Sequence, residues 1–498
     1  MTRKVFCQQR LQLVIAVLLF TMVKATRAFA IGAPQQTALF KTSSLLELRS
    51  SAAAVEGNTV ASTKEANLPS WEDLQASLDH QAQEEGEASN DNRKNKAALV
   101  TLYRDTNGWC PFCERVWLAL EIKQIPYEEQ LINLQDKPSW FKQMVPTGLV
   151  PAVLFHSDAM ASKEEEEEES SDNDEQEKPT PERTLVWESL NILKALDEQF
   201  PNTPRLILDD QEDYQRAREI VSNATTAGGQ FVYSGRNQTM SDEEKQQKRT
   251  AFENALKSLD DFLQSQQSPK GGFCLGESIS GVDIEMVPIM ERWRYQLPLT
   301  INMTIYDTQK YPNLCKWYNA MDRYAPYTNR VAGDAYSWTA VASTFLRFFA
   351  TGPNGTMSQE TRATIDRADA VANDLTKTFA SSNKYDETTQ ARIQAAAKLI
   401  GNHKAVVKDC INPDPKSQKE LPRAQKEEIA DLALRAVAQS LLTEKPPSLF
   451  LDDKDVAAEA ASALRTVAAR LSAPRDMGAP AAQMLRKTLI ALETELAQ

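Results

Sequence analysis

The pattern of apolar and polar positions is most informative around the single C-x-x-C pair of cysteines in the sequence. An apolar stretch from Ala98 to Tyr103 is typical of a strand, and a polar turn containing Gly108 follows it. Cys110 and Pro111 come next, and apolar residues then recur at helical spacing from Val116 to Leu120. Proline is well tolerated in the first turn of a helix, because its missing N–H would have no partner there. The pattern therefore predicts that Cys110 lies where a strand passes into the N-terminus of a helix.

The following residues continue to alternate between strand and helix patterns. A second strand is predicted within Ile125–Ile132, and a short helix within Asp136–Phe141. A strand beginning at Ala152 is expected to form a hairpin with Arg183–Trp187. A helix with one apolar face is then predicted from Leu190 to Phe200.

From about residue 206 the pattern is helical. Residues 206–335 contain two S-x-x-E or S-x-x-D capping boxes, Ser241–Glu244 and Ser280–Asp283, each ahead of an apolar helix. Residues 336–498 are rich in alanine and carry leucine stripes at helical spacing, but they contain no motif that indicates a function. We therefore expect an extra α-helical region at the C-terminus.

The N-terminus has the pattern of a targeting segment. Three basic residues within the first ten precede Leu11–Val23, a largely apolar stretch that is too short for an ordinary membrane span. We expect a signal peptide over 1–28, with a signal anchor as the alternative, and a disordered segment over 29–95. This arrangement resembles the two-part presequence of proteins that reach secondary plastids through the ER. We expect a plastid location, with the secretory pathway as the alternative, and no stable membrane span after processing.

Composition excludes several classes of function. The 498 residues include 56 basic and 69 acidic side chains, giving a net charge of −13, and no basic cluster indicates a nucleic-acid interface. Nucleic acid is therefore not an expected partner. Six cysteines in a chain of this length do not suggest a disulfide-rich scaffold.

A dense acidic run interrupts the predicted hairpin between residues 157 and 182. Like charges at this density repel one another and stay solvated, so we interpret the segment as a flexible insertion at the hairpin tip. The alternative is a docking tail. Lengthening a surface loop in this way costs little conformational entropy.

The spacing Cys110-Pro-Phe-Cys113 indicates thiol chemistry. Unpaired backbone N–H groups and the positive end of the helix dipole favour an anion at a helix N-terminus, and a thiolate is an anion. Cys110 is therefore a candidate nucleophile or redox thiol. The alternative is half of a zinc site, but the chain has no second C-x-x-C pair and only three histidines. No metal is expected.

Two further features could hold an amino-acid ligand. Glu188 and Ser189 open a predicted helix, whose backbone N–H groups could take a carboxylate while Glu188 takes an ammonium group. The alternative is an ordinary helix cap. The Val150–Pro151 bond precedes a strand and is a candidate for a cis peptide.

These motifs, in this order, resemble a known family. The succession of a strand, the CPFC helix, a strand, LINLQDKPSWF, TGLVPAVLF and a WES helix resembles the thioredoxin-like N-terminal domain of glutathione transferases, here over 96–205. It is most similar to the cysteine-dependent omega class and the dehydroascorbate reductases. The stretch from Gly272 to Trp293 resembles the all-α C-terminal domain of that family, here over 206–335. The resemblance implies an α/β thioredoxin-like domain followed by a helical domain.

The resemblance also implies roles for individual residues. Cys110 corresponds to the catalytic cysteine that forms a mixed disulfide with glutathione, and Lys137 to the lysine that contacts the glycyl end. Val150 and Pro151 correspond to the cis-proline element, where the backbone of the preceding residue pairs with the cysteinyl unit.

Glu188 and Ser189 correspond to the pair that holds the γ-glutamyl group. Cys113 departs from the omega pattern. It is either a resolving thiol, as in a dithiol glutaredoxin, or a buried structural residue.

The resulting hypothesis is a glutathione-dependent thiol transferase or dehydroascorbate reductase that uses glutathione as co-substrate. Its expected partners are a small-molecule or glutathionylated thiol substrate and, as an alternative to a monomer, a second copy of the chain. One competing hypothesis is a transferase that conjugates glutathione to electrophiles, for which Tyr103 is the nearby strand hydroxyl. Another is a non-enzymatic binding module with a transferase-like fold.

Overall fold

The computed structural model describes residues 68–88, 97–156, 184–232, 240–266, 271–349, 357–412 and 423–498. The chain divides into two compact units. The first unit takes the described residues from 97 to 331 and from 338 to 370, and the second takes 68–88, 332–337 and the described residues from 371 to 498. The predicted signal peptide over 1–28 and the acidic insertion over 157–182 lie outside the described residues.

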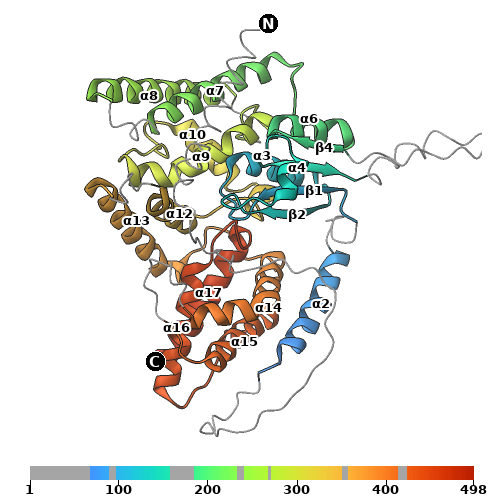
Figure 1. The fold of residues 1–498 in the computed structure, drawn as a ribbon, viewed down its shortest axis with the longest axis vertical. Coiled ribbons are helices and arrows are strands. Elements are labelled where there is room, and N and C mark those ends of the chain that lie inside the picture. Colours follow the sequence, from blue (N-terminus) through green and yellow to red (C-terminus); the bar gives the residue numbers. More distant parts are fainter. Residues whose placement is uncertain are drawn as a thin grey trace, which may run out of the picture. The chain divides into compact units, whose positions relative to one another are not determined.

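A four-stranded sheet in the order β2-β1-β3-β4 organises the first unit (Figure 1). β1 runs parallel to β2 and antiparallel to β3, and β3 pairs with β4 in the hairpin predicted from the sequence. The strands are β1 (Val100–Asp105), β2 (Tyr127–Ile132), β3 (Ala152–Phe155) and β4 (Thr184–Trp187). The central strand, β1, therefore leads directly to the C-x-x-C pair.

Helices pack against both faces of this sheet. α3 (Pro111–Lys123) and α6 (Ser189–Gln199) pack on one face and on each other. Arg104 of β1 points to that face, with its guanidinium 4.0 Å from the ring centre of Trp117 in α3. Its neighbour Tyr103 points to the other face, because side chains alternate along a strand.

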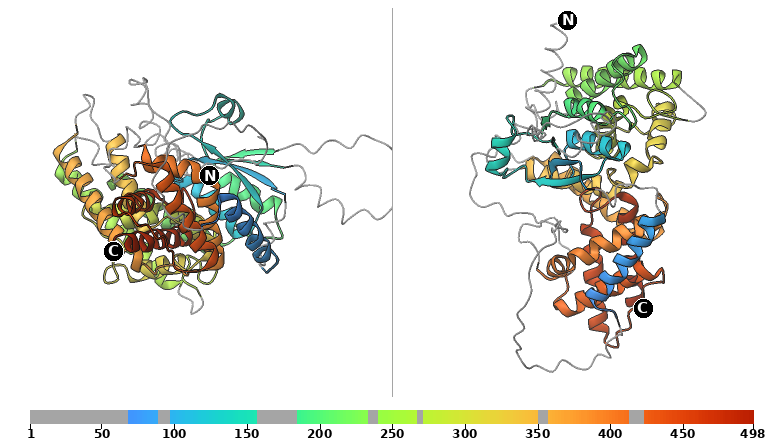
Figure 2. Two further views of the ribbon diagram at one scale, coloured as in Figure 1. Left: turned by 90° about the horizontal axis from the view of Figure 1, so that it is seen from below. Right: turned by 90° about the vertical axis from the view of Figure 1, so that its right-hand side faces the viewer.

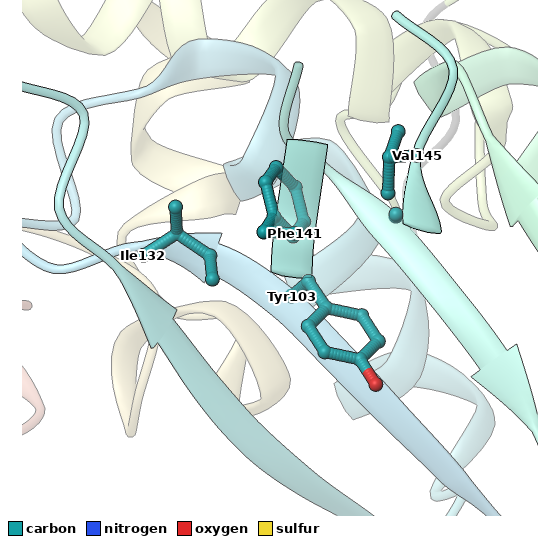
Figure 3. Packing of buried hydrophobic residues seen from close by; sticks show 5 residues of the cluster. Tyr103, Ile132, Phe141 and Val145 are labelled. Atoms are coloured by element: carbon teal, nitrogen blue, oxygen red, sulfur yellow. The ribbon is translucent and has the colours of Figure 1, made fainter. Parts of the chain in front are cut away.

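The opposite face of the sheet packs against α4 (Ser139–Met144). Tyr103, Ile132, Phe141 and Val145 form a buried cluster there together with Ala152 (Figure 3). The rings of Tyr103 and Phe141 have centroids 6.0 Å apart. Because strand residues from β1, β2 and β3 all contact α4, this cluster fixes the short helix on the sheet.

The rest of the first unit is helical, as predicted. Ser241 and Glu244 form the expected capping box: the Ser241 N–H donates to the Glu244 carboxylate at 3.0 Å, and the Glu244 N–H donates to the Ser241 hydroxyl at 3.2 Å. In the second box, the fully buried Asp283 also accepts hydrogen bonds from the Cys274 N–H and the Trp317 indole. The helices are α7 (Glu212–Val232), α8 (Asp242–Ser265), α9 (Gly281–Thr300), α10 (Pro312–Met321), α11 (Ala325–Thr328), α12 (Ala335–Phe349) and α13 (Gln359–Lys377), of which α12 from Trp338 and α13 up to Ala370 belong to this unit.

The second unit is a separate helical bundle. Arg486 is buried in it, bound to Asp334, and its guanidinium lies against the rings of both Tyr336 and Phe379. The bundle contains α14 (Thr389–Ile411), α15 (Glu427–Thr443), α16 (Lys454–Arg470), α17 (Ala479–Leu496) and the short 3-10 helix η3 (Phe379–Ser381). The predicted helical character of the C-terminal region is therefore confirmed in its described residues.

One helix of this bundle comes from the N-terminal side of the chain. The prediction of a disordered segment over 29–95 is wrong for α2 (Trp71–Ala88), which lies along α14 and α15 (Figure 2). Trp71 stacks on His403 with ring centroids 4.4 Å apart, and its indole donates to Asp431 at 2.7 Å. The apolar stripe of α2 is sparse, so its order depends on contacts with residues more than 300 positions away, which no local pattern reveals.

The predicted fold class is confirmed: an α/β thioredoxin-like domain precedes a helical domain and further helices. Of the helices in the described part of the chain, none has both the length and the apolar character needed to cross a membrane.

Candidate functional site

Cys110 lies at the N-cap of α3, as the sequence predicted. Pro111 occupies the first turn, and the Cys113 N–H points at the Cys110 sulfur, with 3.4 Å between nitrogen and Sγ. The Cys110 side chain is partly accessible. A sulfur in this position faces the backbone N–H groups of the first helical turn.

The turn before Cys110 is held by the end of β1. The Asp105 carboxylate accepts the Trp109 N–H at 2.7 Å, and Gly108 adopts a φ of 68°, a left-handed conformation that suits glycine. The chain can therefore reverse within a few residues and deliver Cys110 to the start of the helix. Sequence analysis identified Gly108 as a turn residue but missed Asp105, whose only signal is its place at the end of the strand.

Cys113 is in a very different environment from Cys110. Its side chain is 1% exposed. Burial raises the pKa of the Cys113 thiol well above its ordinary value; Cys110 and the charge of Asp105 act in the same direction, against a smaller opposing effect of a hydrogen bond to the Asp105 backbone. Cys113 is therefore expected to remain a protonated thiol near neutral pH.

Three cations interact electrostatically with the Cys110 sulfur: Arg115, Lys137 and Arg292. Lys137 also donates to the carbonyl of Gly148 at 2.8 Å, and partial burial lowers its pKa. Arg115 and Arg292 come from α3 and α9, and sequence analysis assigned neither to the site. Arg115 is near Cys110 because both belong to the start of α3, whereas the proximity of Arg292 depends on how α9 packs on α3, which is a long-range contact.

The strand register brings the other candidate residues to the same edge of the sheet. Tyr103 pairs with Ala152, and Ala152 pairs with Trp187. Pro151 comes one residue before β3, and Glu188 comes one residue after β4. Both therefore lie at the edge of the sheet from which β1 leads towards Cys110. The Val150–Pro151 bond is cis, which confirms the prediction made for it.

Glu188 and Ser189 begin α6 in an unusual conformation. Glu188 is exposed and has a φ of 69°, which is rare for a residue other than glycine, and Ser189 is 4% exposed. Strained backbone of this kind costs about 1–3 kcal/mol and often marks a functional position. The backbone N–H groups of the first turn of α6 are available to an anionic ligand at this point.

The possible metal ligands at this site are fewer than the four that a structural zinc site uses. Potential ligand atoms of Asp105, Cys110 and Cys113 lie within 4.8 Å of one another, and the described residues add no fourth side chain to this group. Structural zinc sites are four-coordinate and closed. That no metal is needed here stays a prediction from the sequence.

Comparison with known proteins identifies two domains. Residues 109–199 match the family described as glutathione S-transferase, N-terminal domain, and residues 224–323 match glutathione S-transferase, C-terminal domain. The glutathione S-transferase DHAR2 of Arabidopsis thaliana is 28% identical over 184 residues, which cover 37% of this chain and 67% of that protein.

Two further known proteins are similar to parts of this chain. The chloroplastic glutathione S-transferase DHAR3 of Arabidopsis thaliana is 27% identical over 218 residues, 43% of this chain and 65% of that protein. The crystal structure of Chlamydomonas reinhardtii dehydroascorbate reductase matches 47% of this chain and 92% of its own, with 20% identity and a TM-score of 0.35. Residues 109–199 and 224–323 therefore resemble, in chain order, the N-terminal and C-terminal domains of glutathione S-transferases, and the two Arabidopsis relatives are named as glutathione S-transferases as well.

Proposed function

We propose that the protein is a glutathione-dependent thiol transferase or dehydroascorbate reductase with Cys110 as its nucleophile. The observation that carries this proposal is the contrast between the two cysteines. The Cys110 sulfur is accessible, caps a helix N-terminus and interacts with three cations, whereas Cys113 is buried. A nucleophilic cysteine needs an accessible site in positive surroundings.

The proposed reaction passes through one mixed disulfide. The Cys110 thiolate attacks the glutathionyl sulfur of a substrate disulfide; the Cys110–glutathione bond forms, and the substrate thiolate leaves and takes a proton. A second glutathione thiolate then attacks the glutathionyl sulfur, which releases oxidised glutathione and restores the Cys110 thiolate. For dehydroascorbate, two reduced glutathione molecules supply the two electrons and two protons of the reduction, and they leave as oxidised glutathione.

The glutathione cleft is assigned to Lys137, Val150, Glu188 and Ser189, next to Pro151. The Lys137 ammonium is suited to the glycyl carboxylate, and the Val150 backbone to the cysteinyl unit. Glu188 is suited to the γ-glutamyl ammonium, while Ser189 and the first turn of α6 suit its carboxylate. Support comes from the shared edge of the sheet and from the strained φ of Glu188.

Cys113 as a resolving thiol is the alternative mechanism. To attack the mixed disulfide, the buried thiol would have to lose its proton, although burial, Cys110 and the charge of Asp105 raise its pKa. These effects favour a second glutathione as the resolving group. A dithiol cycle would require Asp105 or a water molecule to accept the Cys113 proton.

Conjugation of electrophiles is a weaker candidate. It would require a hydroxyl that stabilises the glutathione thiolate. Tyr103 lies in the cluster on the α4 face of the sheet, next to Phe141 and Trp140, and α3 packs on the opposite face (Figure 3). A purely binding function is disfavoured by the retained Lys137, Glu188 and Ser189.

Replacement of each cysteine tests the mechanism. Cys110→Ser should reduce turnover of hydroxyethyl disulfide and dehydroascorbate with glutathione to background, whereas Cys113→Ser should retain a good part of it. Chlorodinitrobenzene serves as the probe for conjugation. Equal losses in the two variants would establish a dithiol cycle, and turnover of chlorodinitrobenzene alone would refute the thiol transferase assignment.

We assign the protein to the plastid, which supplies both reduced glutathione and dehydroascorbate. The presequence pattern and the chloroplastic name of one Arabidopsis relative support this location. Four N-x-S/T sequons, including the exposed Asn223 and Asn302, allow a test. Protein recovered from cells should lack glycan, and glycan at either residue would indicate the secretory pathway instead.

A further inference from the structure

Arg292, a buried arginine of α9, contacts the loop that carries Cys110. Arg292 of α9 donates through Nη2 to the carbonyl of Trp109 at 3.0 Å and through Nη1 to the Glu114 carboxylate at 2.6 Å. It also donates to the carbonyl of Pro288, and its guanidinium lies 4.3 Å from the ring centre of Trp338. With its side chain 11% exposed, the group has little freedom to move.

The two groups that Arg292 joins lie on either side of Cys110. The Trp109 carbonyl is in the peptide unit that links Trp109 to Cys110, and Glu114 is one helical turn beyond the cysteine. The N–H of Trp109 is held by Asp105 at 2.7 Å. The peptide units before and after Trp109 are therefore both fixed, one from β1 and one from α9.

We propose that Arg292 is a positioning residue that sets the location of the Cys110 sulfur by holding the Trp109 carbonyl against the first turn of α3. This inference rests on the proposed role of Cys110 as nucleophile. Arginine suits the task because its planar guanidinium binds two acceptors at once, which a lysine ammonium does much less well. Its positive charge also lies close enough to interact with the Cys110 sulfur.

The carboxylates around Arg292 explain how a buried cation is tolerated. Glu114 and Glu291 are both buried, 3% and 6% exposed. Burial and the adjacent Glu291 raise the pKa of Glu114 to about 8, against the opposing effect of Arg292. Near neutral pH the Glu114 carboxyl group therefore largely keeps its proton while it accepts a hydrogen bond from Arg292.

Charged and titratable groups surround Cys110 and Arg292 on several sides. The titratable and charged groups around Cys110 and Arg292 come from β1, α3, the segment before α4, α9 and α11: Asp105, Cys113, Glu114, Arg115, Lys137, Glu291 and Tyr327.

The test compares Arg292→Gln with Arg294→Gln in the full chain. Arg294 lies on the same helix, is paired with Asp322 at 2.9 Å and is not among the groups around Cys110, so it controls for loss of a partly buried arginine from α9. Two quantities are measured: kcat and KM for glutathione with hydroxyethyl disulfide, and the rate of alkylation of Cys110 by iodoacetamide from pH 5 to pH 10, followed by mass spectrometry of the Cys110 peptide.

We expect Arg292→Gln to lower kcat about tenfold or more, because small displacements of a reacting group have effects of this size, while KM for glutathione changes little. The midpoint of the alkylation profile should move to higher pH. Arg294→Gln should leave kcat and the profile unchanged. If Arg292→Gln does not fold, Arg292→Lys replaces it, and it should show part of the loss in kcat because it keeps the charge without the planar fork.

Two results would overturn the inference: an Arg292 variant whose kcat and alkylation profile match the wild type, or an equal loss in the Arg294 variant. Failure of the proposed function gives a different pattern. If the wild-type protein shows no glutathione-dependent turnover, the proposed function fails, yet alkylation of Cys110 still reports whether Arg292 positions the sulfur.

Discussion

Gly228 and Gly229 of α7 offer a matched pair of substitutions that tests how α7 packs on α8 and α9. A Cβ atom at Gly228 would lie 2.1 Å from Cη2 of Trp293 and 2.6 Å from Cε2 of Phe252, whereas a Cβ at Gly229 would have no atom within 4 Å. Normal contacts between carbon atoms are about 3.5–4.0 Å. Only the first substitution therefore forces the aromatic rings to move.

The expected magnitudes follow from two opposing effects. Gly-to-Ala in a helix interior is worth about 0.8–1.0 kcal/mol in favour of the folded state, and this gain is common to both positions. At Gly228 it is opposed by overpacking, typically about 1–3 kcal/mol, and by disturbance of an edge-to-face pair worth about 0.5–1.5 kcal/mol. That pair is Phe252 and Trp293, which are 0% and 3% exposed, with ring centroids 5.1 Å apart.

Gly228→Ala should therefore lower the free energy of unfolding of the first unit by about 1–3 kcal/mol, and Gly229→Ala should raise it by up to about 1 kcal/mol. Calorimetry of the full chain measures both, because shifts of the first unit's transition can be compared between variants. A change of 1 kcal/mol corresponds to roughly 2–4 °C in Tm for a unit of this size. Equal shifts for the two alanine variants would show that α7 does not approach Trp293 as closely as described.

Three further predictions concern buried charge, α2 and pH. Lys123→Met removes a fully buried ammonium bound to Asp197 and should lower the free energy of unfolding by about 3 kcal/mol or more. Lys194→Met, at an exposed ion pair, should lower it by less than about 1 kcal/mol, and urea unfolding distinguishes the two variants. A chain that starts after α2 should show a lower Tm for the helical bundle than one that starts at residue 68, because the apolar stripe of α2 is lost; equal Tm values would contradict its role. The pKa of Glu114 rises from 4.5 to about 8 on folding, so between these values the folded state holds a proton that the unfolded state has lost. The stability contributed by this group therefore falls as the pH rises through that window. Glu114→Gln should flatten the fall in Tm between pH 5 and pH 8, and an unchanged slope would refute the assignment.

Local pattern was sufficient for the elements around Cys110. The strand that ends at Asp105, the proline in the first turn of α3 and the hairpin of β3 with β4 each follow from the preferences of a few neighbouring residues. The register of that hairpin then carries Glu188 to the same edge as Pro151. Periodicity and turn chemistry act over distances of one or two turns, so the sequence alone could locate these features.

The tertiary structure decided the properties that depend on distant residues. Whether Cys110 or Cys113 is accessible depends on burial beneath the helices, and the charges near Cys110 include Arg292, 182 positions away by sequence number. Likewise, the order of α2 depends on contacts with α14 and α15. Burial and electrostatic interaction depend on distance in space, and a chain folded through many long-range contacts leaves no local signal for them.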